Sequence, residues 1–349
     1  MTMLSQFKGS IAYTLISFAV AALIAPQGDV LGTLWIVAVL SVLEVSLSLD
    51  NAVVNAKVMA NMSEIWRARF LTWGMLIAVV GMRGILPVAI GSATSGIDPW
   101  TLLHLAIHDE HRYAQVMEAA HPLIAAFGGA FLMLVALAFF VDHEKELHWL
   151  PAIENPLAAI ARWSSPPTFG VRSILIGVTL LTIACVSRWL PPTVSWPFMV
   201  AGLIGVVSWV LVDALGNMFK VDEAPGAVAK QGLAGFLYLN VLDAAFSFDG
   251  VVGAFALTSK IFVILIGLGI GAMFVRSMTI YLVRQGTLAE YRYLEHGAFW
   301  AIAALAGVML ASPIFHIPEA VTGLIGAFFI GAALLNSVVS NRRAAAAQA

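Results

Sequence analysis

The sequence predicts an all-α, polytopic membrane protein. Three observations lead to that fold class: the composition, the spacing of the apolar runs, and an acidic motif that occurs twice. Of the 349 residues, 60% are hydrophobic and only 11% are charged. Soluble domains carry about 25% charged residues. Because so few charges cannot cover a soluble globule of this length, most of the surface must face lipid.

Ten apolar stretches are long enough to cross a bilayer, which takes about 20 residues. The first follows Lys8 and has features of a signal-peptide core. We predict a retained helix there, because the charge pattern and the repeat described below both require it. The ten predicted spans are 10–25, 33–58, 69–95, 122–141, 172–190, 196–215, 232–258, 261–283, 297–312 and 318–340.

The basic residues indicate the direction in which these spans cross. With the N-terminus inside, cytoplasmic segments hold 13 of the 18 Lys and Arg residues, outer loops hold three, and two lie within spans. Cytoplasmic loops of membrane proteins are enriched in Lys and Arg. The partition therefore predicts about ten transmembrane helices with both the N- and the C-terminus in the cytoplasm.

The acidic motif occurs once in each half of the chain. "EVSLSLDNAVV" begins at Glu44 and "DAAFSFDGVVGAF" begins at Asp243, and an offset of 199 residues also aligns Asp50 with Asp249. Ten spans then divide into five plus five. Because five is odd, the two halves enter the membrane in opposite senses, which is the inverted repeat typical of secondary transporters.

The repeat predicts two domains of similar build. The first is 1–190, which includes a cytoplasmic loop at 142–171, and the second is 191–349, which ends in a short tail. In each half, the span after the acidic motif carries one arginine, Arg83 or Arg276. In such transporters the substrate site lies near the midplane between the repeats.

The four repeated carboxylates are the main functional signal. An ionised side chain at mid-bilayer costs about 2.5–3.5 kcal/mol on insertion scales, so it is seldom kept without a use. Four carboxylates and two arginines leave two negative charges, which one divalent cation would neutralise. Oxygen ligands suit hard cations such as Mn²⁺, Mg²⁺ or Ca²⁺, and no Cys or His lies beside the acids. Alternatively, the acids and arginines are structural ion pairs.

The local pattern of the first motif predicts an irregular helix. Regular helical geometry places Glu44, Ser48 and Asn51 on one face and turns Asp50 away from them. We therefore predict a broken or bulged helix in both halves, which would turn the second acid inward and free backbone carbonyls as ligands. In the second half, Gly250 makes such a break easier.

A histidine-rich segment precedes the fourth span. His104, His108 and His111 would share one helical face at steps of four and three, which is a metal-ligand spacing. The alternative is a solvated amphipathic helix. The single cysteine, Cys185, rules out a multi-cysteine metal site. No HExxH motif and no pairing of nucleophile and base is present, so we do not predict an enzyme.

The motifs "EVSLSLDNAVV" and "DAAFSFDGVVGAFALT", followed by "MRGILPVAI" and "VRSMTIYLV", resemble the TerC family of integral membrane proteins, within the superfamily of LysE-type exporters. The resemblance is nearest to a TerC-related branch defined only as a domain of unknown function. It implies inverted helical repeats and metal-ion efflux, notably of manganese. The implied ligands are Glu44, Asp50, Asn51, Asp243 and Asp249, with Arg83 and Arg276 in support. Ser48 and Ser247 would support the site or simply bond to backbone carbonyls.

The leading hypothesis is a secondary transporter that exports a divalent metal cation, with Mn²⁺ as the first candidate. Since no nucleotide-binding motif is present, a proton gradient or the membrane potential would drive it. Two alternatives stay open: a membrane assembly or stress factor for exported proteins without net transport, and an amino-acid exporter of the LysE type, which needs a larger pocket. We expect a multi-pass protein of the bacterial cytoplasmic (inner) membrane, with lipid and the transported ion as partners, no nucleic acid and no tightly bound cofactor.

Overall fold

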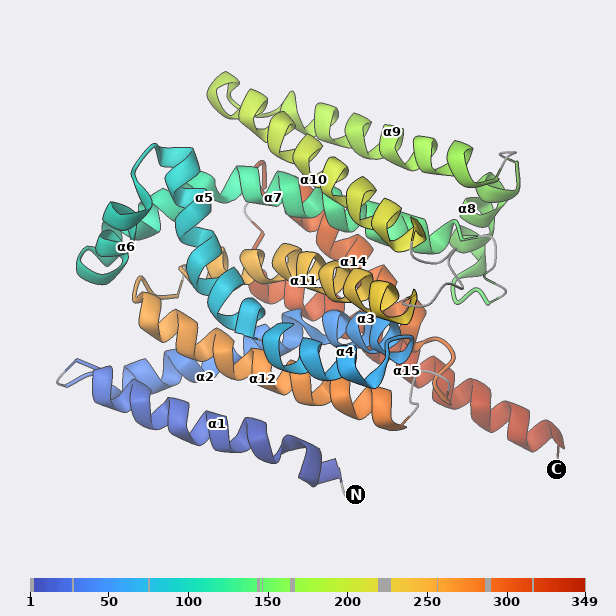
Figure 1. The fold of residues 1–349 in the computed structure, drawn as a ribbon, viewed down its shortest axis with the longest axis horizontal. Coiled ribbons are helices and arrows are strands. Elements are labelled where there is room, and N and C mark those ends of the chain that lie inside the picture. Colours follow the sequence, from blue (N-terminus) through green and yellow to red (C-terminus); the bar gives the residue numbers. More distant parts are fainter. Residues whose placement is uncertain are drawn as a thin grey trace. The chain divides into compact units, whose positions relative to one another are not determined.

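The computed structural model describes residues 3–26, 28–74, 76–142, 145, 147–163, 167–218, 227–255, 257–285, 290–315 and 317–348, and its regular secondary structure within these residues is entirely helical. Figure 1 shows the helices. In chain order they are α1 Met3–Ile24, α2 Val30–Leu47, α3 Leu49–Ala60, α4 Glu64–Arg69, the π-helices η1 Phe70–Gly74 and η2 Ile77–Ile85, α5 Leu86–Ser95, α6 Pro99–His108, α7 Glu110–Phe140, α8 Pro151–Trp163, α9 Pro167–Ser187, α10 Pro192–Met218, α11 Ala227–Ala254, α12 Ile261–Gln285, α14 Leu294–Ala311 and α15 Glu319–Gln348.

The predicted spans coincide with these helices. Within the described residues, nine helical segments are long and apolar enough to cross a membrane. The remaining predicted span, 232–258, corresponds to α11, whose apolar stretch Gly232–Ser247 is shorter. The chain is therefore an all-α, multi-pass membrane protein, as predicted. The cytoplasmic placement of the termini stays a prediction.

The helices form two compact units that alternate along the chain. The first unit is Met1–His121 with Leu215–Gly286, and the second is Pro122–Ala214 with Thr287–Ala349. Each unit therefore takes helices from both predicted domains, 1–190 and 191–349. The predicted division into domains 1–190 and 191–349 and the inverted repeat both stay predictions.

In the first unit, α12 packs along α1, α2 and α3, while α11 packs against η2 and α3. Leu40, Val251 and Leu268 form part of a buried cluster that joins α2, α11 and α12. A side chain at Gly267 would collide with Leu40, so this glycine lets α12 approach α2 closely. The packing places both acidic motifs in one unit.

A sharp helix boundary separates the three histidines. The side chain of Asp98 caps α6 by accepting a hydrogen bond from the Thr101 N–H at 2.9 Å. The helix ends at His108, because Asp109 leaves helical geometry with φ −139° and ψ 69°. His111 belongs to α7, so the prediction of one helical face for all three histidines was wrong.

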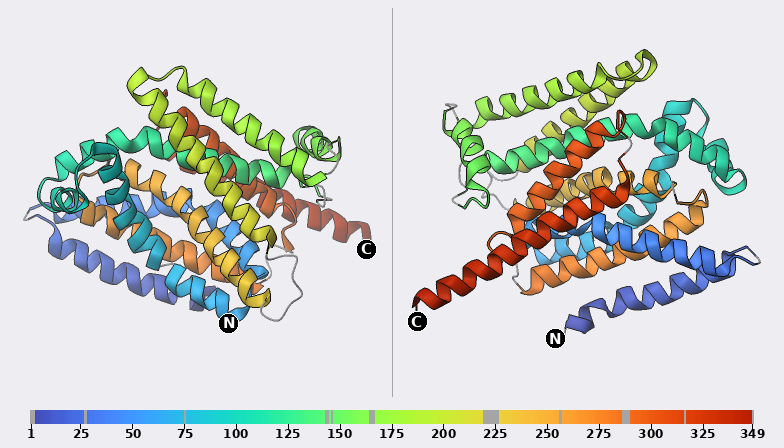
Figure 2. Two further views of the ribbon diagram at one scale, coloured as in Figure 1. Left: turned by 45° about the horizontal axis from the view of Figure 1, so that its top comes forward. Right: turned by 180° about the vertical axis from the view of Figure 1, so that it is seen from behind.

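In the second unit, α14 and α15 run side by side (Figure 2). Gly297 of α14 makes this approach possible, since a side chain there would collide with Ala333 of α15. The rings of Phe139 and Phe299 stack with 3.8 Å between their centroids and tie α7 to α14. Together these contacts fix α7, α14 and α15 as one packed group.

The predicted cytoplasmic loop 142–171 contains helix α8, and Glu154 anchors it. This carboxylate is fully buried. It accepts hydrogen bonds from Lys145 Nζ at 3.1 Å, from Trp300 Nε1 at 3.0 Å, and from the N–H groups of Trp149 and Leu150 at 3.2 and 3.3 Å. Burial alone would raise the pKa of Glu154, but these donors and the charge of Lys145 hold the pKa below its ordinary value.

Candidate cation site

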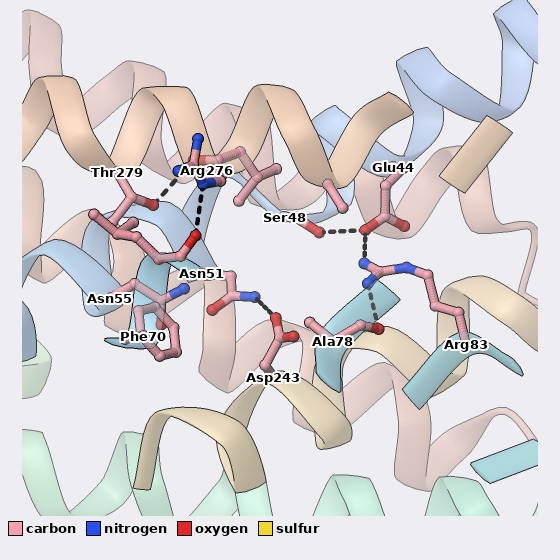
Figure 3. A pocket seen from close by; sticks show the side chains of 13 residues that line it. Glu44, Ser48, Asn51, Asn55, Phe70, Ala78, Arg83, Asp243, Arg276 and Thr279 are labelled. Atoms are coloured by element: carbon pink, nitrogen blue, oxygen red, sulfur yellow. Dashed lines mark hydrogen bonds and ion pairs between the residues drawn. The ribbon is translucent and has the colours of Figure 1, made fainter. Parts of the chain in front are cut away.

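A small polar cavity lies in the first unit, and Figure 3 shows its lining. Residues of both acidic motifs and both predicted arginines contribute to it. The lining residues are Glu44, Ser48, Asn51, Asn55, Phe70, Leu71, Ala78, Arg83, Asp243, Ala272, Val275, Arg276 and Thr279. They come from α2, α3, η1, η2, α11 and α12, with Ser48 at the junction between α2 and α3. The chain thus gathers polar groups from segments that lie about 200 residues apart around one space.

Glu44 and Arg83 form a buried ion pair at one end of the lining. Their side chains are only 2% and 3% exposed. Ser48 Oγ donates to Glu44 Oε1 at 3.1 Å, and Arg83 Nη1 donates to the Ala78 carbonyl at 3.0 Å. Arg83 lies on the π-helix η2, and π-helical turns are frequent at functional sites. The pair compensates two charges that would each be costly in an apolar surrounding.

Two glycines make room for Glu44. A side chain at Gly271 of α12 would collide with the Glu44 side chain, and a Cβ at Gly250 of α11 would lie 3.2 Å from Glu44 Oε2. The backbones of α11 and α12 therefore approach this carboxylate from two sides. The function of Gly250 is close approach rather than a helix break.

The predicted helix break occurs in the first motif, where a single residue interrupts the helix. Ser48 separates α2 from α3 with φ −106° and ψ 15°. The Ser48 N–H still bonds to the Glu44 carbonyl at 3.0 Å, and the Ala52 N–H bonds to the Ser48 carbonyl at 3.1 Å. In the second motif the prediction was wrong, because α11 continues through Gly250 without interruption. Packing against Glu44 accounts for the glycine there.

Asp243 meets the amide of Asn51 across the cavity. Asn51 Nδ2 donates to Asp243 Oδ1 at 2.6 Å. The remaining amide oxygen of Asn51 is buried and has no hydrogen-bond partner among the described residues, and the same holds for Asn55 Oδ1. Buried oxygens are almost always paired with a donor, an ordered water or an ion. These two amide oxygens beside a carboxylate are therefore acceptors available to a water or a cation.

The cavity is small. The space open to the centre of a water molecule is about 20 Å³. A volume of roughly 10–15 Å³ on this measure holds one water. The cavity therefore accommodates one water molecule or one bare metal ion, and it excludes a solute of amino-acid size in this conformation.

The second acids of the two motifs lie differently. Asp50 is buried, at 3% exposure, and its Oδ1 accepts a hydrogen bond from the Asn51 backbone N–H at 2.9 Å. Asp50 is not part of the lining. The backbone of Asp249 lies in α11, but its side chain falls outside the described part of the chain. The structure therefore brings together Glu44, Asn51 and Asp243, and leaves the ligand roles of the two second acids as predictions.

Arg276 approaches the cavity from α12 but differs from Arg83 in its partner. Its Nε donates to the Leu71 carbonyl at 2.9 Å. No carboxylate pairs with it among the side chains that the structure describes. Ser247 is buried next to the motif on α11, and its hydroxyl has no hydrogen-bond partner in the described part of the chain. Within those residues, no three side chains of the His, Cys, Asp and Glu types lie close enough together to hold a metal.

Comparison with known proteins identifies the family. The model of a family described as "Protein of unknown function (DUF475)" matches residues 49–344, which is most of the chain. The chain belongs to the DUF475 family. That match includes every residue of the cavity lining except Glu44 and Ser48, which precede it.

One relative of this DUF475 protein is the uncharacterized membrane protein YceF of Bacillus subtilis strain 168. The two are 27% identical over 154 residues, which is 42% of this chain and 54% of YceF. The chain thus matches about half the length of that relative. No solved structure matches the chain. The comparisons support a multi-pass membrane protein, and the resemblance to TerC proteins stays an expectation from the motifs.

Asn55 and Thr279 of this DUF475 protein line the cavity but were not among the predicted site residues. Asn55 follows Asn51 by one helical turn, so it lies on the same face of α3, and a second amide on that face of an apolar helix was a usable signal. Thr279 follows Arg276 by three residues on α12, but its hydroxyl bonds to the Val275 carbonyl at 2.9 Å. Asn55 therefore adds an available oxygen to the site, whereas the Thr279 hydroxyl already satisfies a backbone group.

Proposed function

We propose that this protein is a secondary transporter that moves a small, hard divalent cation, with Mn²⁺ as the first candidate, through the cavity around Asp243. The single observation that carries the proposal is the cluster of one partly buried carboxylate, from Asp243, and two buried amide oxygens without a described partner, from Asn51 and Asn55. Oxygen-only ligand sets favour hard cations such as Mn²⁺, Mg²⁺ and Ca²⁺. The motif likeness to TerC proteins points to the same class of substrate.

The charges of the lining assign different roles to the two carboxylates. Arg83 neutralises Glu44, whereas the described hydrogen-bond partner of Asp243 is the uncharged amide of Asn51. Asp243 is therefore the lining carboxylate with free capacity for an incoming cation. Glu44 and Arg83 would hold α2 and η2 in place beside it.

Two acids and two arginines line the cavity, so the lining is neutral when all four groups are charged. A divalent cation would add uncompensated positive charge, which is costly in an apolar surrounding. Asp50 adjoins the ligand Asn51 through a hydrogen bond to its backbone. We therefore assign to Asp50 the role of a charge-compensating group, outside the lining but required for divalent binding.

The size of the cavity favours an ion over the competing substrate. An amino-acid exporter of the LysE type needs a pocket for a whole solute, whereas this cavity has room for one water or one ion. An amino-acid exporter in a closed conformation would have to open before it could bind or release its solute. A competition assay between an amino acid and a metal ion therefore distinguishes the two substrates. Excess lysine would leave the flux of a metal ion unchanged.

The test is Mn²⁺ flux from loaded proteoliposomes that contain the purified full chain. We expect efflux driven by an imposed proton gradient or membrane potential, and a rate at least about tenfold lower for Asp243→Asn, which corresponds to about 1.4 kcal/mol. Glu64→Gln is the matched control, because Glu64 is an exposed carboxylate on α4. Equal rates for wild type and Asp243→Asn would remove the cavity from the transport pathway.

A folded protein without any flux would favour the other class of function, a membrane assembly or stress factor. In that case Asp243→Asn would still weaken equilibrium binding of Mn²⁺, because the ion would act as a structural or delivered metal. Flux and binding measured on the same preparation therefore separate transport from metal-dependent assembly.

A further inference from the structure

Helix α6 carries two exposed histidines one turn apart. The rings of His104 and His108 are stacked, with 4.0 Å between their centroids and 11° between their planes. Both side chains are exposed. Within the first unit, α6 lies at the end away from the N-terminus, where α1 connects to α2 (Figures 1 and 2). This helix is separate from the cavity around Asp243.

The hydrogen bond of His108 prepares one ring nitrogen for metal binding. His108 Nδ1 lies 3.1 Å from the His104 carbonyl. A carbonyl can only accept, so this contact requires a proton on Nδ1 and leaves the lone pair of Nε2 free. A metal-binding histidine almost always donates its other ring N–H to such a carbonyl or carboxylate, which fixes its tautomer and orientation.

The spacing of the two rings suits one ion. Zinc binds a histidine nitrogen at about 2.0–2.1 Å, so two nitrogens on one tetrahedral ion lie about 3.3 Å apart. Near-parallel rings with centroids 4.0 Å apart reach that separation through small rotations about their side-chain bonds. Because the helix holds both rings one turn apart, little conformational entropy is lost when an ion bridges them.

We propose that His104 and His108 form a surface chelate for a borderline transition metal of the Zn²⁺, Cu²⁺ or Ni²⁺ class. Imidazole suits these ions, whereas Mn²⁺ and Mg²⁺ prefer oxygen ligands. The site is therefore chemically distinct from the oxygen-lined cavity, and it does not depend on the proposed transport. With two protein ligands, water fills the other positions, so the bound metal exchanges freely.

The experiment is a Zn²⁺ titration of the purified full chain in detergent, against a competing chromophoric chelator, with a purification tag that contains no histidine. We expect one Zn²⁺ site whose affinity falls at least about tenfold in His104→Gln and equally in His108→Gln, because each variant removes one arm of the chelate. His111→Gln is the matched control, since His111 lies nearby but on α7.

The results separate this site from its neighbours. Unchanged Zn²⁺ binding in His111→Gln and in Asp243→Asn supports the proposal. It is overturned if either His104→Gln or His108→Gln binds Zn²⁺ as tightly as wild type. It is also overturned if His111→Gln loses as much affinity as those two variants. Because all three histidines are exposed, the variants keep the fold, which far-UV circular dichroism verifies.

Discussion

The side-chain amide of Asn51 on α3 donates a hydrogen bond to the carboxylate of Asp243 on α11, with 2.6 Å between Nδ2 and Oδ1. The two residues stand 192 positions apart in sequence. This bond links the first acidic motif to the second inside one compact unit. Asn51 and Asn55 line the same small cavity, and the amide oxygen of each has no hydrogen-bond partner among the described residues.

Removal of the Asn55 amide oxygen tests the ligand set without changing charge. We expect Asn55→Leu, which keeps the number and branching of the side-chain heavy atoms, to weaken Mn²⁺ flux at least about tenfold, because the cation loses one oxygen ligand. The fold should persist or gain stability, since a buried amide oxygen without a partner is replaced by an apolar group. Flux and thermal unfolding on the same preparation check both parts. Wild-type flux in this variant would exclude Asn55 as a ligand.

Asp50→Asn tests charge compensation. The amide keeps the size of the side chain and can still accept the hydrogen bond from the Asn51 N–H. We expect Mn²⁺ binding to weaken at least about tenfold, because a divalent cation then adds uncompensated charge to a neutral lining. A monovalent thallium ion should be affected less than Mn²⁺. Equal losses for both ions would argue that Asp50 acts through local structure instead.

Glu44 and Arg83 should behave as a coupled pair. Glu44→Gln leaves the buried guanidinium of Arg83 without its counter-ion, and loss of one partner of a buried pair costs about 3–5 kcal/mol. We expect Arg83→Gln added to Glu44→Gln to restore much of that stability. Unfolding of the single and double variants in mixed micelles measures the coupling. Strictly additive losses would show that the two side chains do not depend on each other.

Gly271 should not tolerate a side chain. A methyl group there would collide with the Glu44 side chain, and overpacking of a close-packed core costs about 1–3 kcal/mol. We expect Gly271→Ala to lower the unfolding temperature. Gly177→Ala on α9 is the control, because its Cβ would meet open space and alanine is the better helix former by about 1 kcal/mol. A Gly271→Ala protein as stable as wild type would contradict the close approach of α12 to Glu44.

Glu154 should make stability depend on pH. Its pKa is lowered in the folded protein, so the ionised carboxylate stabilises the fold above its unfolded pKa, about 4.3. That contribution disappears as the pH falls through the lower folded pKa. We therefore expect Glu154→Gln to be about 1–3 kcal/mol less stable than wild type at pH 7. The gap should narrow in acid. Glu118→Gln, at an exposed position on α7, should leave stability unchanged, and a constant gap for Glu154→Gln would contradict the charged state.

The sequence predicted the spans and the meeting of the two motifs better than the local geometry. The low charge content was sufficient to place the helices, and the 199-residue offset was sufficient to predict that Glu44 and Asp243 lie in one region. The unbroken α11 was not predictable, because a glycine permits both a helix break and a close helix contact, and only packing decides between them. The end of α6 at His108 was also not predicted, because the spacing of the histidines alone does not show where a helix ends.

Side-chain partners were the least predictable feature of the cavity. Both arginines looked equivalent in the repeat, yet Arg83 pairs with Glu44 while Arg276 bonds to the Leu71 carbonyl. The partner of each arginine depends on which neighbouring segment its helix packs against, and tertiary packing determines this. Glu154 lay in the predicted loop 142–171, but Pro151 begins a helix there, where the missing N–H of proline costs nothing.

The most direct test of the central claim is equilibrium binding of Mn²⁺ to the purified full chain, followed by the loss of the electron paramagnetic resonance signal of the free ion. We expect one Mn²⁺ site, which Asp243→Asn abolishes and which both Glu64→Gln and the double variant His104→Gln/His108→Gln retain. Mn²⁺ binding that is unchanged by Asp243→Asn would contradict the claim that this cavity holds the cation.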